Sequence, residues 1–165
     1  MGGSSPMMRS KNIVILALSL VILLTVAFIF GNSLKGPEES SEQSGRVVKF
    51  LRPILDPYER LSVDEFSHIV RKSAHFLEYC LLGFELAVLG FYVTGRVTIS
   101  GLTLSAFGCL LTADIDEFIQ SFTGRGSAVA DVLLDFSGGL TGIAMGIGTS
   151  CLAAYLLQKR SKEIK

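Results

Sequence analysis

Long apolar runs restrict the folds open to this chain more than any other feature. The clearest run covers residues 13–30 and contains no charged side chain. A helix of about 20 residues crosses the hydrocarbon core of a bilayer, so this run is long enough to span it. Further apolar segments cover 74–92, 97–113 and 129–157. Because backbone amides in lipid must be hydrogen-bonded internally, the pattern predicts an all-α integral membrane protein built as a four-helix bundle.

The composition agrees with a membrane protein and excludes several other classes. Hydrophobic residues make up 49% of the chain, only 18% of residues are charged, and the formal net charge is zero. Neutral charge without a basic, aromatic-rich patch gives no support to nucleic-acid binding. The three cysteines, Cys80, Cys109 and Cys151, lie inside apolar runs, where they are typical of small buried hydrophobes. No catalytic-serine elbow and no glycine-rich phosphate loop is present.

Polar flanks divide the chain into three parts. We predict a disordered N-terminal tail, a four-helix membrane domain and a basic tail, at residues 1–11, 12–157 and 158–165. Short cytoplasmic flanks of membrane helices are enriched in Lys and Arg, and here these residues gather in both termini and beside Gly95. The bias predicts a multi-pass protein with both termini cytoplasmic. A cleaved signal peptide is the alternative for the first run, but no small-x-small site follows it.

The connector between the first two spans contains two helix signals. Residues 35–42, Lys-Gly-Pro-Glu-Glu-Ser-Ser-Glu, are polar and have the composition of a loop. Apolar residues then recur at helical spacing over 46–55, which predicts a short amphipathic helix on the membrane surface in the first extracytoplasmic loop. Ser62 and Glu65 have the spacing of a capping box, which predicts the start of the second long helix.

Ionisable residues gather on three of the predicted helices, although each costs about 2.5–3.5 kcal/mol at mid-membrane. On the second long helix, Arg71, His75 and Glu78 share one face. The topology brings the charged parts of all three helices to the same outer end of the bundle, which predicts one polar site. The predicted binding residues are Arg71, Lys72, His75, Glu78, Asp116, Glu117, Gln120, Arg125, Asp131 and Asp135.

The chemistry of this predicted site has open alternatives. His75, Glu78 and Glu117 are the candidates for acid–base catalysis, whereas basic side chains near acids also suit a phosphate or carboxylate headgroup. No metal-ligand spacing is present, so the sequence predicts no metal site and identifies no cofactor. Clustered carboxylates nevertheless leave a divalent cation as an alternative.

Glycines recur every fourth residue on the last span. Gly138, Gly142 and Gly146 form a ridge of small residues that lets a neighbouring helix approach closely. We interpret this ridge as a packing surface.

Four motifs taken in order resemble the VanZ-like family of bacterial membrane proteins. They are Phe30-Gly-Asn-Ser, Arg71-Lys-Ser-Ala-His-Phe-Leu-Glu-Tyr, Asp116-Glu-Phe-Ile-Gln-Ser-Phe-Thr-Gly-Arg and Asp131-Val-Leu-Leu-Asp-Phe-Ser-Gly-Gly-Leu-Thr-Gly. The resemblance covers roughly 12–157. Gly31 and Gly124 depart from it, since the family often has Ser and Pro there. The resemblance implies a bacterial cell membrane and low-level resistance to glycopeptide antibiotics such as teicoplanin.

Three functions remain open from the sequence. The first is a protein that binds membrane lipids and a lipid-linked cell-wall precursor or lipoglycopeptide at the outer leaflet. The second is an enzyme acting on a lipid-linked headgroup by acid–base or metal-assisted chemistry. The third is a purely structural polar network, which requires every charge to be paired and no cavity to be present. The sequence sets no oligomeric state.

Overall fold

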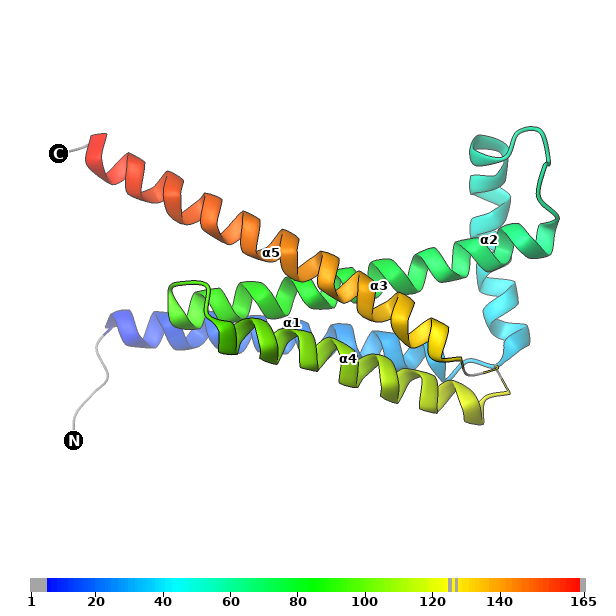
Figure 1. The fold of residues 1–165 in the computed structure, drawn as a ribbon, viewed down its shortest axis with the longest axis horizontal. Helices are drawn as coiled ribbons and strands as arrows, with labels where there is room; N and C mark the ends of the chain where they lie inside the picture. The colour runs from blue at the N-terminus through cyan, green and yellow to red at the C-terminus, as the bar shows by residue number, and fades with distance from the viewer. Residues whose placement is uncertain (1–5, 125, 127, 164–165) are drawn as a thin grey trace.

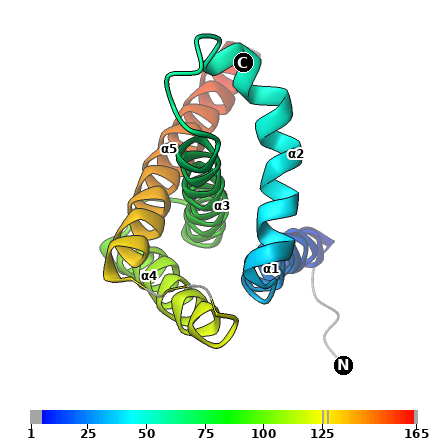
Figure 2. The ribbon, with the colours of Figure 1, turned by 90° about the vertical axis from the view of Figure 1, so that its right-hand side faces the viewer.

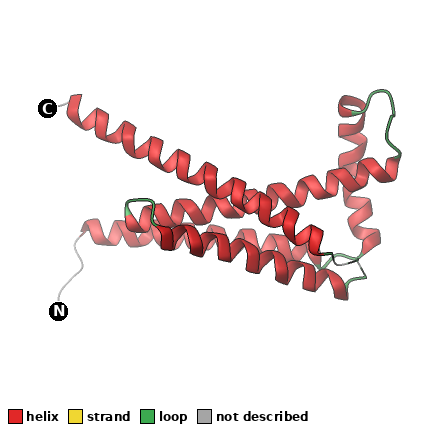
Figure 3. Cartoon of the chain, viewed as in Figure 1, coloured by secondary structure: helices red, strands yellow, loops and turns green. Residues whose placement is uncertain are grey.

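The chain folds entirely into helices over the part that the structure, a computed structural model, describes. Described are residues 6–124, 126 and 128–163, and within them no strand occurs (Figure 3). The five helices are α1 (Pro6–Ser33), α2 (Pro37–Leu55), α3 (Val63–Thr94), α4 (Ile99–Phe122) and α5 (Val129–Glu163). The predicted all-α class is therefore confirmed.

Four helices run lengthwise, and α2 lies across one end of them (Figures 1 and 2). The start of α1, the turn between α3 and α4, and the end of α5 share the opposite end (Figure 1). A bond from Lys11 Nζ to the Val93 carbonyl, 3.2 Å long, joins the first two of these segments. The connections α1–α2, α2–α3 and α4–α5 all lie at the end that carries α2, which is the pairing of ends that the sequence predicted.

The prediction of four membrane spans is supported only in part. Among the described residues, three helices are long and apolar enough to cross a membrane: α1, over Met8–Ser33, together with α3 and α5. Helix α4 is not one of them. Its second half carries Asp114, Asp116 and Glu117, which shorten its uninterrupted apolar stretch.

Two helices begin earlier than the sequence pattern indicated. Helix α1 starts at Pro6, ahead of the apolar run 13–30, while residues 1–5 of the predicted disordered tail lie outside the described part. Helix α2 starts at Pro37, so the loop predicted over 35–42 was wrong from Pro37 onward. Pro at the first helical position and Glu38 and Glu39 in the first turn, near the positive helix end, explain this start.

The ends of α3 follow their sequence signals. The Ser62 side chain accepts from the Glu65 amide at 3.2 Å, and the Glu65 carboxylate accepts from the Ser62 amide at 2.9 Å. The predicted capping box is thus confirmed. Gly95 ends the helix with a φ of 70°, a left-handed conformation that favours glycine.

Helices α3 and α5 cross with their backbones almost touching. A Cβ added to Gly142 would lie 1.8 Å from the Cys80 carbonyl oxygen, and one on Gly138 would lie 2.4 Å from that of Phe76. The close contact explains why small residues recur on α5, as the packing interpretation predicted. Around this crossing lies a buried core of Ile29, Tyr79, Leu82, Ala87, Cys109, Ala113 and Ile143.

The connection from α2 to α3 is held by one buried carboxylate. Asp56 accepts hydrogen bonds from the amides of Arg60, at 2.8 Å, and Leu61, at 3.0 Å. The Leu61 carbonyl in turn accepts from the Arg52 guanidinium at 2.9 Å. These bonds fix where α2 lies relative to α3.

The same bonds predict that acid loosens this connection. The Leu61 amide and then the Arg60 amide lower the pKa of Asp56 below its ordinary 3.8. A carboxylate whose pKa is lower in the folded than in the unfolded state stabilises the fold at pH values above its unfolded-state pKa. That contribution to stability is lost as the pH falls through the folded-state pKa. We expect amide hydrogen exchange at both residues, corrected for intrinsic rates, to accelerate below pH 3.8.

The variant Asp56→Asn should show the faster exchange already at neutral pH, because an amide offers one acceptor oxygen in place of two. Glu59→Gln is the control, since Glu59 is exposed in the same connection. Unchanged exchange in Asp56→Asn would contradict the assignment.

Candidate functional site

Three helices place the predicted charged residues at the end of the bundle that carries α2. Helix α3 contributes Arg71, Lys72, His75 and Glu78, helix α4 contributes Asp116, Glu117 and Gln120, and helix α5 contributes Asp131 and Asp135. Contacts between them bridge the helices, including an ion pair between Lys72 and Asp131. Arg125, the remaining predicted residue, lies outside the described residues.

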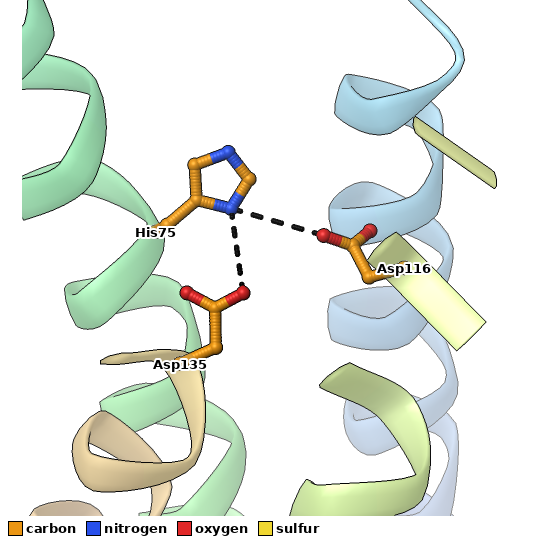
Figure 4. A group of neighbouring side chains, drawn as sticks. All are labelled: His75, Asp116 and Asp135. Carbon is orange, nitrogen blue, oxygen red and sulfur yellow. Dashed lines mark ion pairs between the residues drawn. The ribbon is translucent and has the colours of Figure 1, made fainter. Parts of the chain in front are cut away.

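His75 faces two buried carboxylates from two other helices (Figure 4). Its Nδ1 lies 3.8 Å from Asp116 Oδ2 and 3.9 Å from Asp135 Oδ2. The imidazole is 17% exposed, whereas the carboxylates are 0% and 2% exposed. The sequence spacing predicted no metal site, yet one possible ligand atom from each of these residues lies within 4.8 Å of the others.

The end of α4 is tied to the end of α1 and to the start of α5. Gln120 Nε2 donates to Asp116 Oδ2 at 2.9 Å and to Ser33 Oγ at 3.3 Å. Glu117 Oε2 accepts from the Ala128 amide at 3.0 Å. Asp116 and Glu117 are therefore held in fixed positions, with 0% and 4% of their surface exposed.

The end of α1 and the residues just after it contribute polar side chains that were not among the predicted binding residues. Asn32 Nδ2 donates to Glu78 Oε1 at 2.9 Å, and Lys35 Nζ donates to Asn32 Oδ1 at 2.9 Å. Ser33 is fully buried beside Gln120. The available signal was the polar pair Asn32-Ser33, which follows directly on an apolar run.

A cavity of about 350 Å³ opens among α3, α4 and α5. Most of the predicted residues line it, and its lining contains both basic and acidic side chains. Its lining consists of Pro37, His68, Arg71, Lys72, His75, Glu117, Gln120, Gly124, Gly126, Asp131, Leu134 and Asp135. His68 was missed from the sequence, although it shares the helical face of Arg71 and His75.

A second cavity, of about 150 Å³, lies between α2, α3 and the end of α1. It is lined by Asn32, Ser40, Gln43, Ser44, Val47, Val70, Arg71, Ala74, His75 and Glu78. Glu78 therefore lies on this side and not in the larger cavity. Helix α2 covers the second cavity. In addition to the apolar face predicted over 46–55, this helix therefore supplies residues that line the cavity. Arg71 and His75 line both cavities.

The two basic residues of α3 differ in their partners. Lys72 is paired with Asp131. For Arg71, no carboxylate lies within ion-pair distance among the residues that the structure describes. The Arg71 guanidinium therefore lines two cavities without a carboxylate partner in the described part of the chain.

A polar pair also occurs deeper in the bundle. Glu85 is 9% exposed, and its Oε1 accepts from Thr25 Oγ1 at 3.0 Å. This bond joins α1 to α3, and Glu85 lines neither cavity.

Comparison with known proteins gives one finding. The profile of the family described as VanZ/LLP1 matches residues 18–152, a region that includes all five helices at least in part and every predicted site residue. No curated protein and no solved structure matches the chain.

Proposed function

Because the chain belongs to the VanZ/LLP1 family, we propose that it is a multi-pass membrane protein with a binding site at the outer leaflet. Its ligand in this proposal is the phosphate-bearing headgroup of a lipid-linked or lipid-tailed envelope molecule. The observation that carries this proposal is Arg71, which lines both cavities without a described carboxylate partner. Guanidinium groups bind phosphate through two parallel hydrogen bonds, and few other side chains match that geometry.

The proposed topology follows from the arrangement of the helices. Helix α4 runs from one end of the bundle to the other beside its neighbours, so we assign it as the fourth crossing (Figure 1). Arg9, Lys11, Arg96 and the basic tail favour a cytoplasmic position for the end that holds both termini. Helix α2 and both cavities then lie at the outer face.

The second cavity supplies a surface for the lipid part of the ligand. Val47, Val70 and Ala74 line it beside Arg71. Helix α2 also exposes Phe50, 72% accessible, which suits a helix lying in the interface between headgroups and chains. A headgroup in the larger cavity would thus have apolar surface next to it.

This proposal predicts that one arginine determines the affinity for phosphate. The probe is a fluorescent short-chain phosphatidic acid, added to the full-length protein in phosphatidylcholine nanodiscs containing EDTA. Hydrogen bonds to charged groups contribute about 1.5–3 kcal/mol, so we expect Arg71→Gln to weaken binding about 10-fold or more. Phosphatidylcholine of the same chain length should not compete.

Arg46→Gln is the matched control, because Arg46 is exposed on α2 and lines neither cavity. Equal affinity of Arg71→Gln and wild type, or equal losses in both variants, would refute the assignment. The same variants expressed in cells test whether the site affects teicoplanin susceptibility, the phenotype that the family resemblance implies.

A second candidate function is an enzyme that acts on the same headgroup. His75 favours it, because the imidazole lines both cavities and its Nδ1 lies 3.8 Å and 3.9 Å from the carboxylates of Asp116 and Asp135. Turnover of the bound phosphatidic acid by wild type, absent in His75→Gln, would support this function. A purely structural network is disfavoured because the charged residues line cavities.

A further inference from the structure

We propose that His75, Asp116 and Asp135 form a binding site for a divalent transition-metal ion, Zn²⁺ or Mn²⁺, in the wall of the larger cavity. One possible ligand atom from each residue lies within 4.8 Å of the others, and the three come from three different helices. Figure 4 shows both carboxylates directed toward the same imidazole nitrogen.

The separations fit an ion better than direct bonds between the side chains. At 3.8 Å and 3.9 Å, the two imidazole–carboxylate distances exceed those of hydrogen bonds. Ligands bound at about 2.0–2.2 Å from a tetrahedral ion lie roughly 3.3–3.6 Å from one another. The two imidazole–carboxylate separations exceed that range by only a few tenths of an ångström, and the two carboxylate oxygens lie within 4.8 Å of each other.

Asp135 supplies independent support for a bound cation. Its side chain is 2% exposed. Its Oδ1 is buried and accepts no hydrogen bond from the described residues, and its Oδ2 is beyond hydrogen-bond distance of the imidazole. A buried carboxylate is costly unless it is paired or coordinates a metal.

The fold holds these groups together rigidly. Gly138 lies almost against the Phe76 carbonyl, where an added Cβ would come within 2.4 Å, and this contact places Asp135 beside His75. Gln120 donates to Asp116 Oδ2 at 2.9 Å and thereby orients that carboxylate. Hydrogen-bonded carboxylates around a metal are typical of sites whose ligands are fixed before the ion binds.

The ligand atoms indicate which metals the site prefers, and the cavity determines where coordination positions stay open. One imidazole and two carboxylates suit Zn²⁺, Mn²⁺ or Fe²⁺ better than Mg²⁺ or Ca²⁺, which prefer oxygen ligands alone. His75 and Asp135 line the larger cavity together with Arg71. An ion there would have coordination positions open to the cavity and, in the part of this inference that rests on the proposed function, would bind a phosphate oxygen of the headgroup.

The test uses metal alone, on the full-length protein in detergent with its affinity tag removed and its metal stripped by EDTA. We expect wild type to bind one equivalent of Zn²⁺ per chain after desalting, and Co²⁺ to give visible absorption bands with the same stoichiometry. Asp135→Asn should bind either metal at least 10-fold more weakly. Asp114→Asn is the matched control, since Asp114 is exposed on α4 and outside the cavity.

Wild type that binds neither metal overturns the proposal, whatever happens to the variants. Binding retained in a folded Asp135→Asn, or equal loss in Asp114→Asn, overturns it as well. If Asp135→Asn does not fold, the wild-type titration decides, since a specific ion must also raise the melting temperature. The lipid assay contains EDTA and this titration contains no lipid ligand, so each proposal fails separately.

Discussion

Gly142→Ala is expected to cause the largest loss of stability among the glycine-to-alanine changes in the described residues. The new Cβ would lie 1.8 Å from the Cys80 carbonyl oxygen and 2.7 Å from its carbonyl carbon, both backbone atoms. Overpacking that side chains can relieve costs about 1–3 kcal/mol. Here α3 and α5 must separate, so the loss should exceed that range.

The measurement is the fraction of monodisperse protein recovered in detergent, together with its melting temperature. Gly148→Ala is the matched control, because Gly148 lies on the same helix with nothing within 4 Å of an added Cβ. We expect that variant to behave like wild type. If the two alanine variants melt at the same temperature, the helices do not cross as closely as described.

Tyr79→Ala is also expected to cause a large loss of stability, and Tyr79→Phe almost none. Tyr79 is fully buried in the core with Ile29, Leu82 and Ile143. Truncation of a large buried aromatic side chain to Ala leaves a cavity and costs about 3–5 kcal/mol. The Tyr79 hydroxyl has no hydrogen-bond partner among the described residues, so its removal should change the free energy of unfolding by less than about 1 kcal/mol.

Thermal unfolding of both variants in one detergent tests this pair. The phenylalanine variant is the internal control, since it keeps the ring and removes one atom. A loss in Tyr79→Phe equal to that in Tyr79→Ala would mean that the hydroxyl makes a stabilising hydrogen bond, and the packing explanation would be wrong.

Local signals in the sequence predicted the parts of the fold that depend on neighbouring residues. Ser62 and Glu65 are three positions apart, so their capping box is readable without a fold. Helical periodicity placed Arg71 and His75 on one face, and the alternation of helix direction brought the charged ends of α3, α4 and α5 together. The glycine ridge on α5 was predicted in the same way.

Contacts between distant residues were not predictable, because they depend on how helices cross. Nothing local indicates that Asn32 donates to Glu78 or that Ser33 meets Gln120. The convergence of His75 with Asp116 and Asp135 also requires the close crossing at Gly138, which the sequence suggests without fixing its register. The start of α2 was not predicted, because its serine-rich composition is typical of a loop and Pro37 alone is a weak signal for a helix start.

The shared wall between the two cavities has a consequence for ligand binding. Arg71 and His75 line both, so a molecule that reorients either side chain from one compartment alters the space and charge offered in the other. The two occupancies are then thermodynamically linked, and each must change the affinity of the other by the same factor. Under the proposed function, this linkage would couple the binding of the headgroup in one cavity to the binding of its chain in the other.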